Sequence, residues 1–195
     1  MFGALGIMLI LLTVFVLGTV FLFMAGVSIY NRLVVNRRQA DNAWSQIDVQ
    51  LKRRCDLIPN LVESVKGYAA HEKGLFENVT KARAGALNAA ASGNQGERIQ
   101  AETQLSGAVR GFMLQVEQYP DLKANQNFMA LQQELAETEN RLSSARQDYN
   151  NVATVYNTSR EQFPANLIAG FFTFPAKDLW NITDAAERET PKVKF

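Results

Sequence analysis

Few residues in this sequence have a type and spacing that would support catalysis or metal binding. His71 and Glu72 match the first two positions of a His-Glu-x-x-His zinc site, but residue 75 is leucine and there is no second histidine. A cysteine–histidine pair would have to join Cys55 to His71, which lie roughly 24 Å apart along a continuous helix. Glycine-rich nucleotide-binding loops are missing too. We therefore predict no catalytic residue, no metal ligand, no cofactor and no enzymatic activity.

Cys55 is the only cysteine, and it falls on the apolar stripe of an expected helix, where a buried, inert thiol is common. A single cysteine excludes an internal disulfide framework and fits a reducing compartment. The formal net charge is +1, so the sequence gives no electrostatic reason to expect nucleic acid as a partner. Charged residues such as Arg53, Arg54, Glu134 and Glu139 could pair between helices, although a solvated face is the ordinary expectation.

The charged side chains are confined to one part of the chain, because the first of them is Arg32. Residues 4–30 are almost entirely apolar, apart from three hydroxyl side chains that can bond to their own helix. A helix of this length covers about 40 Å, which exceeds the ~30 Å hydrocarbon core of a bilayer, so some tilt is expected. A cleaved signal peptide would need a basic start and a shorter apolar run. We therefore predict a transmembrane anchor over residues 1–31.

The cations beside this segment predict its orientation. Arg32, Arg37 and Arg38 follow it directly, whereas no basic side chain precedes it. Cytoplasmic flanks of membrane spans are enriched in lysine and arginine, so we expect the N-terminus outside and the rest of the chain in the cytoplasm. Residues 32–54 carry six basic and two acidic side chains, which would also attract anionic head groups if they do more than set the topology.

Apolar residues after Arg32 recur with helical periodicity and without sustained strand alternation, which predicts an all-α fold. The apolar residues of the first expected helix keep the helical spacing on both sides of Pro59. We therefore expect a kink at this proline rather than the start of a helix. Asn125 is expected to cap the last helix, which carries the longest seam. A loop is expected at residues 92–96. The expected helical stretches are residues 40–69, 72–91, 97–118 and 128–163.

Two topologies fit these helices. A chain reversal between Gly67 and Gly74 gives an antiparallel up-and-down four-helix bundle over residues 32–163, whose last helix travels back toward the bilayer. Without the reversal, the first two helices form one rod that leaves much of its apolar seam uncovered. We favour the reversal, because glycine lowers helix propensity and because the reversal covers the seam.

The remaining residues, 164–195, begin with an aromatic-rich tail that Pro164 and Pro175 make too interrupted to cross a bilayer. In one interpretation its apolar side chains close the open end of the bundle as a lid. In the other they form a membrane-interface or subunit contact, where aromatic residues are favoured. The residues assigned to this contact are Arg32, Arg37, Arg38, Phe171, Phe172, Phe174 and Trp180.

Motifs spread over nearly the whole chain resemble the LemA family. They lie at residues 30–34, 43–54, 56–62, 119–125, 138–140, 145–146, 149–150, 156–157, 163–164 and 191–195. The resemblance implies a single-pass bacterial inner-membrane protein with a cytoplasmic four-helix bundle. It implies no catalytic residue or cofactor. Family genes often occur near membrane proteases of quality control, and one branch is linked to intracellular membrane organelles, so both associations suggest a scaffold or adaptor.

These expectations lead to two functional hypotheses. The first is a non-enzymatic, membrane-anchored scaffold that forms homo-oligomers and organises the lipid bilayer or partner proteins, with membrane proteases among the implied partners. The alternative is a monomeric or dimeric adaptor for membrane protein quality control or signalling, whose bundle binds a partner helix.

Overall fold

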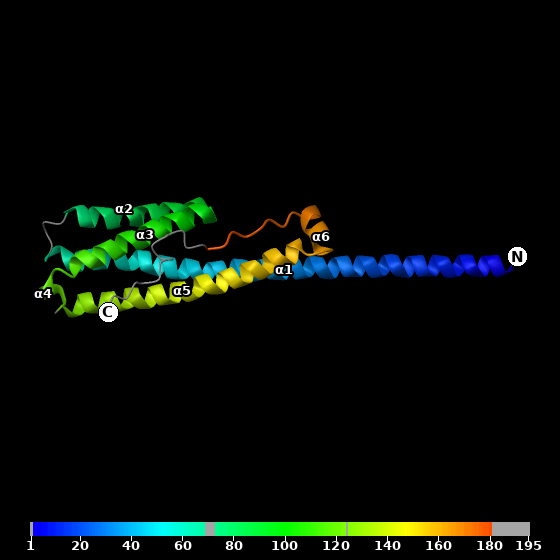
Figure 1. Ribbon diagram of the computed structural model, residues 1–195, viewed down its shortest axis with the longest axis horizontal. Coiled ribbons are helices and arrows are strands. Elements are labelled where there is room, and N and C mark those ends of the chain that lie inside the picture. The colour runs from blue at the N-terminus through cyan, green and yellow to red at the C-terminus, as the bar shows by residue number, and fades with distance from the viewer. Residues whose placement is uncertain (1, 69–72, 124, 181–195) are drawn as a thin grey trace, which may run out of the picture. The chain divides into compact units, whose positions relative to one another are not determined.

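The structure, a computed structural model, describes residues 2–68, 73–123 and 125–180, and these contain helices and no strand (Figure 1). The predicted all-α class is therefore confirmed. The chain divides into two compact units, of which the first contains described residues of Met1–Asp41 and Asn151–Lys177 and the second those of Asn42–Asn150 and Asp178–Phe195. The helices are α1 (Phe2–Lys66), α2 (Lys73–Ser92), α3 (Gln95–Val116), α4 (Pro120–Lys123), α5 (Gln126–Glu161) and α6 (Ala165–Phe171).

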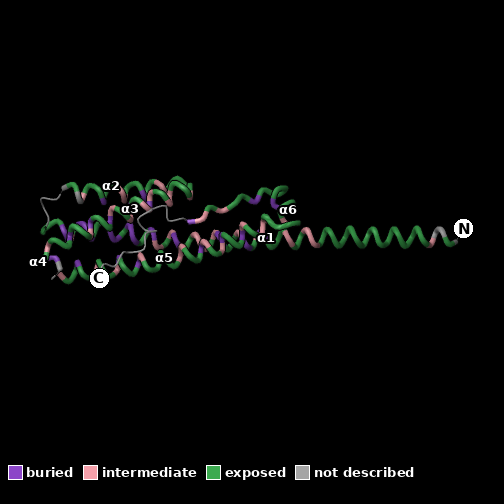
Figure 2. The backbone as a smooth tube through the Cα atoms, in the orientation of Figure 1, coloured by how far each residue is buried: buried purple, intermediate pink, exposed green. Residues whose placement is uncertain are grey.

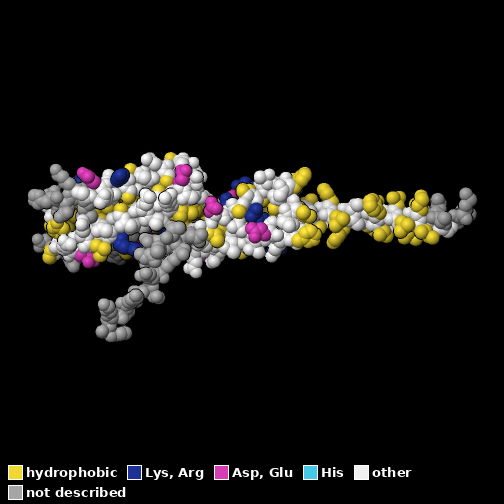
Figure 3. Space-filling view, turned by 45° about the horizontal axis from the view of Figure 1, so that its top comes forward, with side chains coloured by type: hydrophobic (Ala, Val, Ile, Leu, Met, Phe, Trp, Pro, Cys, Tyr) yellow, Lys and Arg dark blue, Asp and Glu magenta, His cyan; other side chains and the backbone are white. Residues whose placement is uncertain are grey.

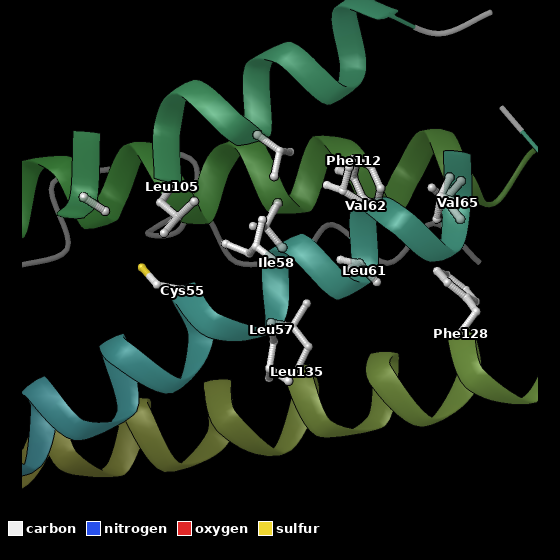
Figure 4. Packing of buried hydrophobic residues seen from close by; sticks show 14 of the residues in the cluster. Cys55, Leu57, Ile58, Leu61, Val62, Val65, Leu105, Phe112, Phe128 and Leu135 are labelled. Carbon is white, nitrogen blue, oxygen red and sulfur yellow. The ribbon is translucent and has the colours of Figure 1, made fainter. Parts of the chain in front are cut away.

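The second unit is a four-helix bundle formed by α2, α3 and parts of α1 and α5, with α4 as a short turn before α5. α2 lies alongside α3, and side chains from all four long helices meet in one core (Figures 1 and 4). The four-helix prediction is thus confirmed. The core includes Ile58, Leu61 and Val62 of α1, Val79 of α2, Leu105 and Phe112 of α3, and Phe128 and Leu135 of α5.

Two asparagines determine where the later helices of this unit begin. Asn125 Oδ1 accepts hydrogen bonds from the backbone N–H groups of residues 127 and 128, at 2.9 and 3.2 Å, so the predicted cap of the last long helix is confirmed. Asn94 caps α3 in the same way. Because Gly93 takes a φ of +72° directly after α2, the chain turns within two residues. The expected loop at residues 92–96 is therefore shorter than predicted.

The predicted reversal is confirmed by a contact between α1 and α2. α1 ends at Lys66 and α2 begins at Lys73, and Arg83 Nε donates a 2.7 Å hydrogen bond to the carbonyl oxygen of Cys55. A single rod would separate these residues by 28 positions, or roughly 42 Å. The same bond explains how α1 continues through Pro59. Proline has no N–H to donate to the carbonyl four residues earlier, so Arg83 supplies the missing donor.

The first unit contains the apolar end of α1 together with the end of α5, the short helix α6 and the chain after it. Residues 7–24 of this apolar segment are all exposed (Figure 2). Thr13 and Thr19 hydroxyls each donate to a carbonyl three residues earlier, both at 2.8 Å, so they add no unpaired polar group. Among the described helices, α1 alone is long and apolar enough to cross a membrane, with a mean hydropathy of 2.8 in its best window.

We predict that the Arg83 bond matters because of Pro59. Arg83→Met should lower the free energy of unfolding by about 1–3 kcal/mol, the typical cost of leaving a buried carbonyl without its partner. The same substitution should cost less in a Pro59→Ala background, where an alanine N–H can bond to the Cys55 carbonyl. Urea unfolding of the full chain in detergent, followed by circular dichroism, measures both values. Equal losses in the two backgrounds would show that Arg83 acts only through its own packing.

Candidate membrane-proximal site

The three arginines predicted to lie beside the membrane follow the apolar end of α1. Arg32 and Arg38 are exposed, and Figure 3 shows hydrophobic side chains gathered over the N-terminal part of α1. Arg37 is half-buried, with its guanidinium carbon 5.1 Å from the ring centre of Phe174, a cation–π contact within the first unit. Arg32 and Arg38 are thus accessible to a head group, whereas Arg37 is also part of the packing.

The four aromatic residues of the candidate site separate into two exposed and two buried side chains. Phe171 and Phe172 are 82% and 54% exposed, whereas Phe174 and Trp180 are each 4% exposed. Phe174 lies in the core of the first unit, and Trp180 lies in the second unit against Trp44, with ring centres 5.6 Å apart. The structure therefore places Phe174 and Trp180 inside the chain, as the lid interpretation expects, and leaves Phe171 and Phe172 on the surface.

α6 lies against the end of the apolar segment. A Cβ on Gly26 would be 4.0 Å from Ile168 Cδ1, and the ring centres of Tyr30 and Phe172 are 4.9 Å apart in an edge-on contact. One face of α6 joins a small core with α1 and α5, in which Leu33, Tyr156, Ala169 and Phe174 are buried. α6 is therefore held beside the residues at which the apolar segment ends.

Two further apolar residues near α6 are exposed: Leu167, which belongs to the aromatic-rich tail, and Phe163, which the sequence places at the end of the last long helix. Phe163 and Leu167 are 80% and 64% exposed, although Phe163 was assigned to the packing seam of the last long helix. α5 ends at Glu161, so the seam stops before Phe163. Leu167 and Phe171 are four residues apart and therefore share one side of α6, a spacing that is visible in the sequence, whereas Phe163 lies in the turn before the helix.

The extended residues 174–180, which we call the strap, follow α6 after a tight turn. Thr173 has a φ of +52°, a conformation that glycine usually takes at helix ends, and Phe174 N–H then bonds to the Ala169 carbonyl at 3.0 Å. In the first unit the side chains of α5 bind the main chain of the strap. Asn157 donates to the Lys177 carbonyl at 2.8 Å and accepts from the Lys177 N–H at 2.9 Å. Tyr156 donates to the Pro175 carbonyl at 2.8 Å.

The same pair of residue types repeats in the second unit, seven residues earlier in α5. Asn150 donates to the Trp180 carbonyl at 2.9 Å and accepts from the Trp180 N–H at 2.7 Å. Tyr149 donates to the Asp178 carbonyl at 2.7 Å. Seven helical residues rise roughly 10.5 Å and three extended residues cover roughly 10 Å, so the Tyr-Asn repeat of α5 matches the spacing of the strap carbonyls. The sequence places these tyrosines in the seam of the last helix and in the family motifs, but it does not show that they bind the strap.

A cleft of about 310 Å³ lies between α3 and α5 in the second unit, with Arg54 of α1 among its lining residues. Arg54 is fully buried and donates to Glu102, to Ser106 at 2.7 Å and to Glu139 at 3.0 Å. The expected ion pair between Arg54 and Glu139 is therefore present, but Arg54 does not lie on a solvated face. Removing one partner of such a buried pair typically costs about 3–5 kcal/mol, so the cluster holds α1, α3 and α5 in register.

Cys55 is buried in the bundle core and is poorly suited to act as a nucleophile. Burial, and then the negative charge of Glu102, raise the pKa of the Cys55 thiol from 9.0 to about 11. The thiolate is therefore scarce near neutral pH. His71 lies outside the described residues, and within them no group of three His, Cys, Asp or Glu side chains is placed to hold a metal ion.

Comparisons with known proteins identify one family. The model of the LemA family matches residues 43–195, beginning after the apolar segment. Magnetosome protein MamQ 2 of Paramagnetospirillum magneticum is 27% identical over 163 residues, which cover 72% of this chain and 60% of that protein. Protein LemA of Metamycoplasma hominis is 25% identical over 163 residues, covering 84% of this chain and 71% of that protein. The chain thus spans about 60% of the length of the MamQ relative.

We predict that the paired hydrogen bonds of Asn157 hold the strap in place. Asn157→Ala should speed hydrogen exchange at the Lys177 amide and lower the free energy of unfolding by about 1–3 kcal/mol, because two main-chain groups lose their partner. Asn151→Ala, at an exposed position of the same helix, is the matched control and should leave the exchange unchanged. Unaltered exchange in the Asn157 variant would mean that the remaining contacts, such as the Tyr156 hydrogen bond and the packing of Phe174, are enough to hold the strap.

The raised pKa of Cys55 predicts a stability change at alkaline pH. The folded protein keeps the thiol proton at pH values where the unfolded chain, with a pKa near 9.0, loses it. The contribution of Cys55 to stability is therefore complete below pH 9 and is lost as pH rises toward about 11. Urea unfolding across this range should show a steeper decline for the natural chain than for Cys55→Ala. Parallel declines would contradict the assignment.

Proposed function

Since the chain belongs to the LemA family, we propose that it is a non-enzymatic, membrane-anchored scaffold that self-associates and organises the membrane or partner proteins. The observation that carries the proposal is α1, whose first part is an exposed apolar segment and whose last part supplies core residues of the bundle. A helix with apolar side chains on every side is unfavourable in water and favourable in hydrocarbon, so α1 serves as the anchor.

The proposed location is the bacterial inner membrane, crossed once, with the N-terminus outside and the bundle in the cytoplasm. This orientation is supported by Arg32, Arg37 and Arg38, which directly follow the apolar segment, because lysine and arginine are enriched on the cytoplasmic side of membrane spans. The single, buried Cys55 also fits a reducing compartment.

A structural role is supported by the state of the reactive groups. The Cys55 thiol is buried with a raised pKa, and Arg54 is compensated by Glu102 and Glu139. Arg54 and Glu102, the buried charged side chains among the described residues, therefore pair with each other, and breaking such a pair is destabilising, which supports a structural role for them. Relatives named as magnetosome proteins support a role in membrane organisation. Membrane proteases are proposed as partners only because the family resemblance implies them.

A specific observation favours a second candidate function, an adaptor for membrane protein quality control or signalling. The cleft between α3 and α5 has the volume of a small ligand site and mixes apolar residues, such as Met113 and Leu135, with Arg110 and Glu139. Side chains of a partner helix would fit such a cleft. This adaptor would act as a monomer or dimer, so the number of subunits separates the two proposals.

We predict that the full-length protein, extracted in detergent at micromolar concentration, has a mass of several times the 21.7 kDa of one chain after correction for detergent. Light scattering after size-exclusion chromatography measures this mass. The same measurement on residues 32–195 shows whether assembly requires the apolar segment. A uniform monomer of the full chain would remove the scaffold and leave the adaptor.

A further inference from the structure

We propose that α6 lies in the head-group region of the bilayer that α1 crosses, with Phe163, Leu167 and Phe171 in contact with lipid. The proposal rests on the anchoring role of α1 and adds a second, separate membrane contact. The proposed binding partner of α6 is the lipid surface where the apolar segment of α1 ends.

The first argument is exposure. Phe163, Leu167, Phe171 and Phe172 all leave more than half of their side-chain surface uncovered, and they fall within ten consecutive residues. Scattered exposed apolar residues are ordinary on soluble proteins, but a concentrated group of large ones marks a surface that contacts something else. α6 itself, from Ala165 to Phe171, contains no charged residue. Its one polar side chain, Asn166, is exposed, so α6 can contact lipid without taking a charge out of water.

The second argument is depth. Ile168 approaches Gly26, and Phe172 stacks edge-on against Tyr30, so α6 lies beside the last turns of the apolar segment. The first charged residue of the chain, Arg32, comes two positions after Tyr30. The boundary between hydrocarbon and head groups must therefore pass near these residues. Aromatic side chains are favoured at this level of a membrane.

The third argument is that α6 has two different faces. Ala165, Ile168 and Ala169 pack against the core of the first unit, whereas Leu167 and Phe171 point away from it. A short helix that buries one side and exposes large apolar residues on the other is held in a fixed orientation. It therefore presents the exposed side chains as a rigid group, which lowers the entropy lost on contact with lipid.

Lipid fits this face better than a second copy of the chain. The part of α1 just before the residues that α6 touches is apolar and exposed, so the face of α6 continues a surface that already faces hydrocarbon in the proposed function. A subunit contact at this place would have to displace lipid from both surfaces. We therefore assign the face to lipid and treat a subunit contact as an outcome of the test.

The test uses the full chain in vesicles of phosphatidylcholine and phosphatidylglycerol, with an environment-sensitive fluorophore on single introduced cysteines. Phe171→Cys and Leu167→Cys report on α6, Phe15→Cys reports on the span, and Leu114→Cys, at an exposed position of α3, reports on the bundle. The natural chain, whose Cys55 is buried, measures background labelling. Lipids that carry a nitroxide either near the head group or deep in the acyl chain serve as quenchers.

The two α6 reporters should lose most of their fluorescence to the shallow quencher and less to the deep one, as expected for a contact near the head groups. Phe15→Cys should respond most to the deep quencher, and Leu114→Cys to neither. Quenching at Phe15→Cys without quenching at either α6 position would overturn this inference while leaving the anchor intact. Loss of quenching at all positions would instead refute the anchoring itself. If the fluorescence of the α6 reporters changes with the protein-to-lipid ratio but not with the quencher, the face would be assigned to a subunit contact.

Discussion

One helix, α1, must satisfy two environments, and the rest of the structure depends on how it does so. Over residues 7–24 it is almost entirely apolar and exposed, which suits hydrocarbon, and from Leu33 onward it is buried on one side against other helices. The change of environment falls within a few helical turns. α1 therefore needs packing partners directly after the apolar segment. In the first unit these partners are α5, α6 and the strap.

Side chains of the helices supply hydrogen-bond partners to several main-chain groups that regular helical bonding leaves unpaired. The strap has an extended backbone with no neighbouring strand, so its N–H and carbonyl groups need partners from elsewhere. Asn150 and Asn157 each act as a donor and an acceptor for one strap residue, much as a neighbouring strand would. Arg83 serves the Cys55 carbonyl that Pro59 leaves without a donor. Polar residues on packed faces thus complete the hydrogen bonding of irregular backbone.

The helices could be predicted from the sequence because their apolar residues keep one period over long stretches. Apolar residues keep the helical period on both sides of Pro59, which predicts that α1 continues through this proline. The position of Asn125 predicts where α5 begins. The burial of Arg54 could not be foreseen, because its partner Glu102 comes from another helix and the pairing depends on how three helices meet. Likewise, the sequence does not show that Phe174 is buried while Phe172 is exposed, since the turn at Thr173 decides which side chain faces the core.

The way in which α5 holds the strap has an evolutionary consequence. Because Asn150 and Asn157 bind only main-chain atoms, they impose no chemistry on the side chains of the segment they hold, and positions such as Ala176 and Leu179 are free to drift between relatives. Proline is the exception: it has no N–H, so selection should exclude it where Lys177 and Trp180 now stand. Divergent tails with little sequence identity can therefore keep the same docking geometry.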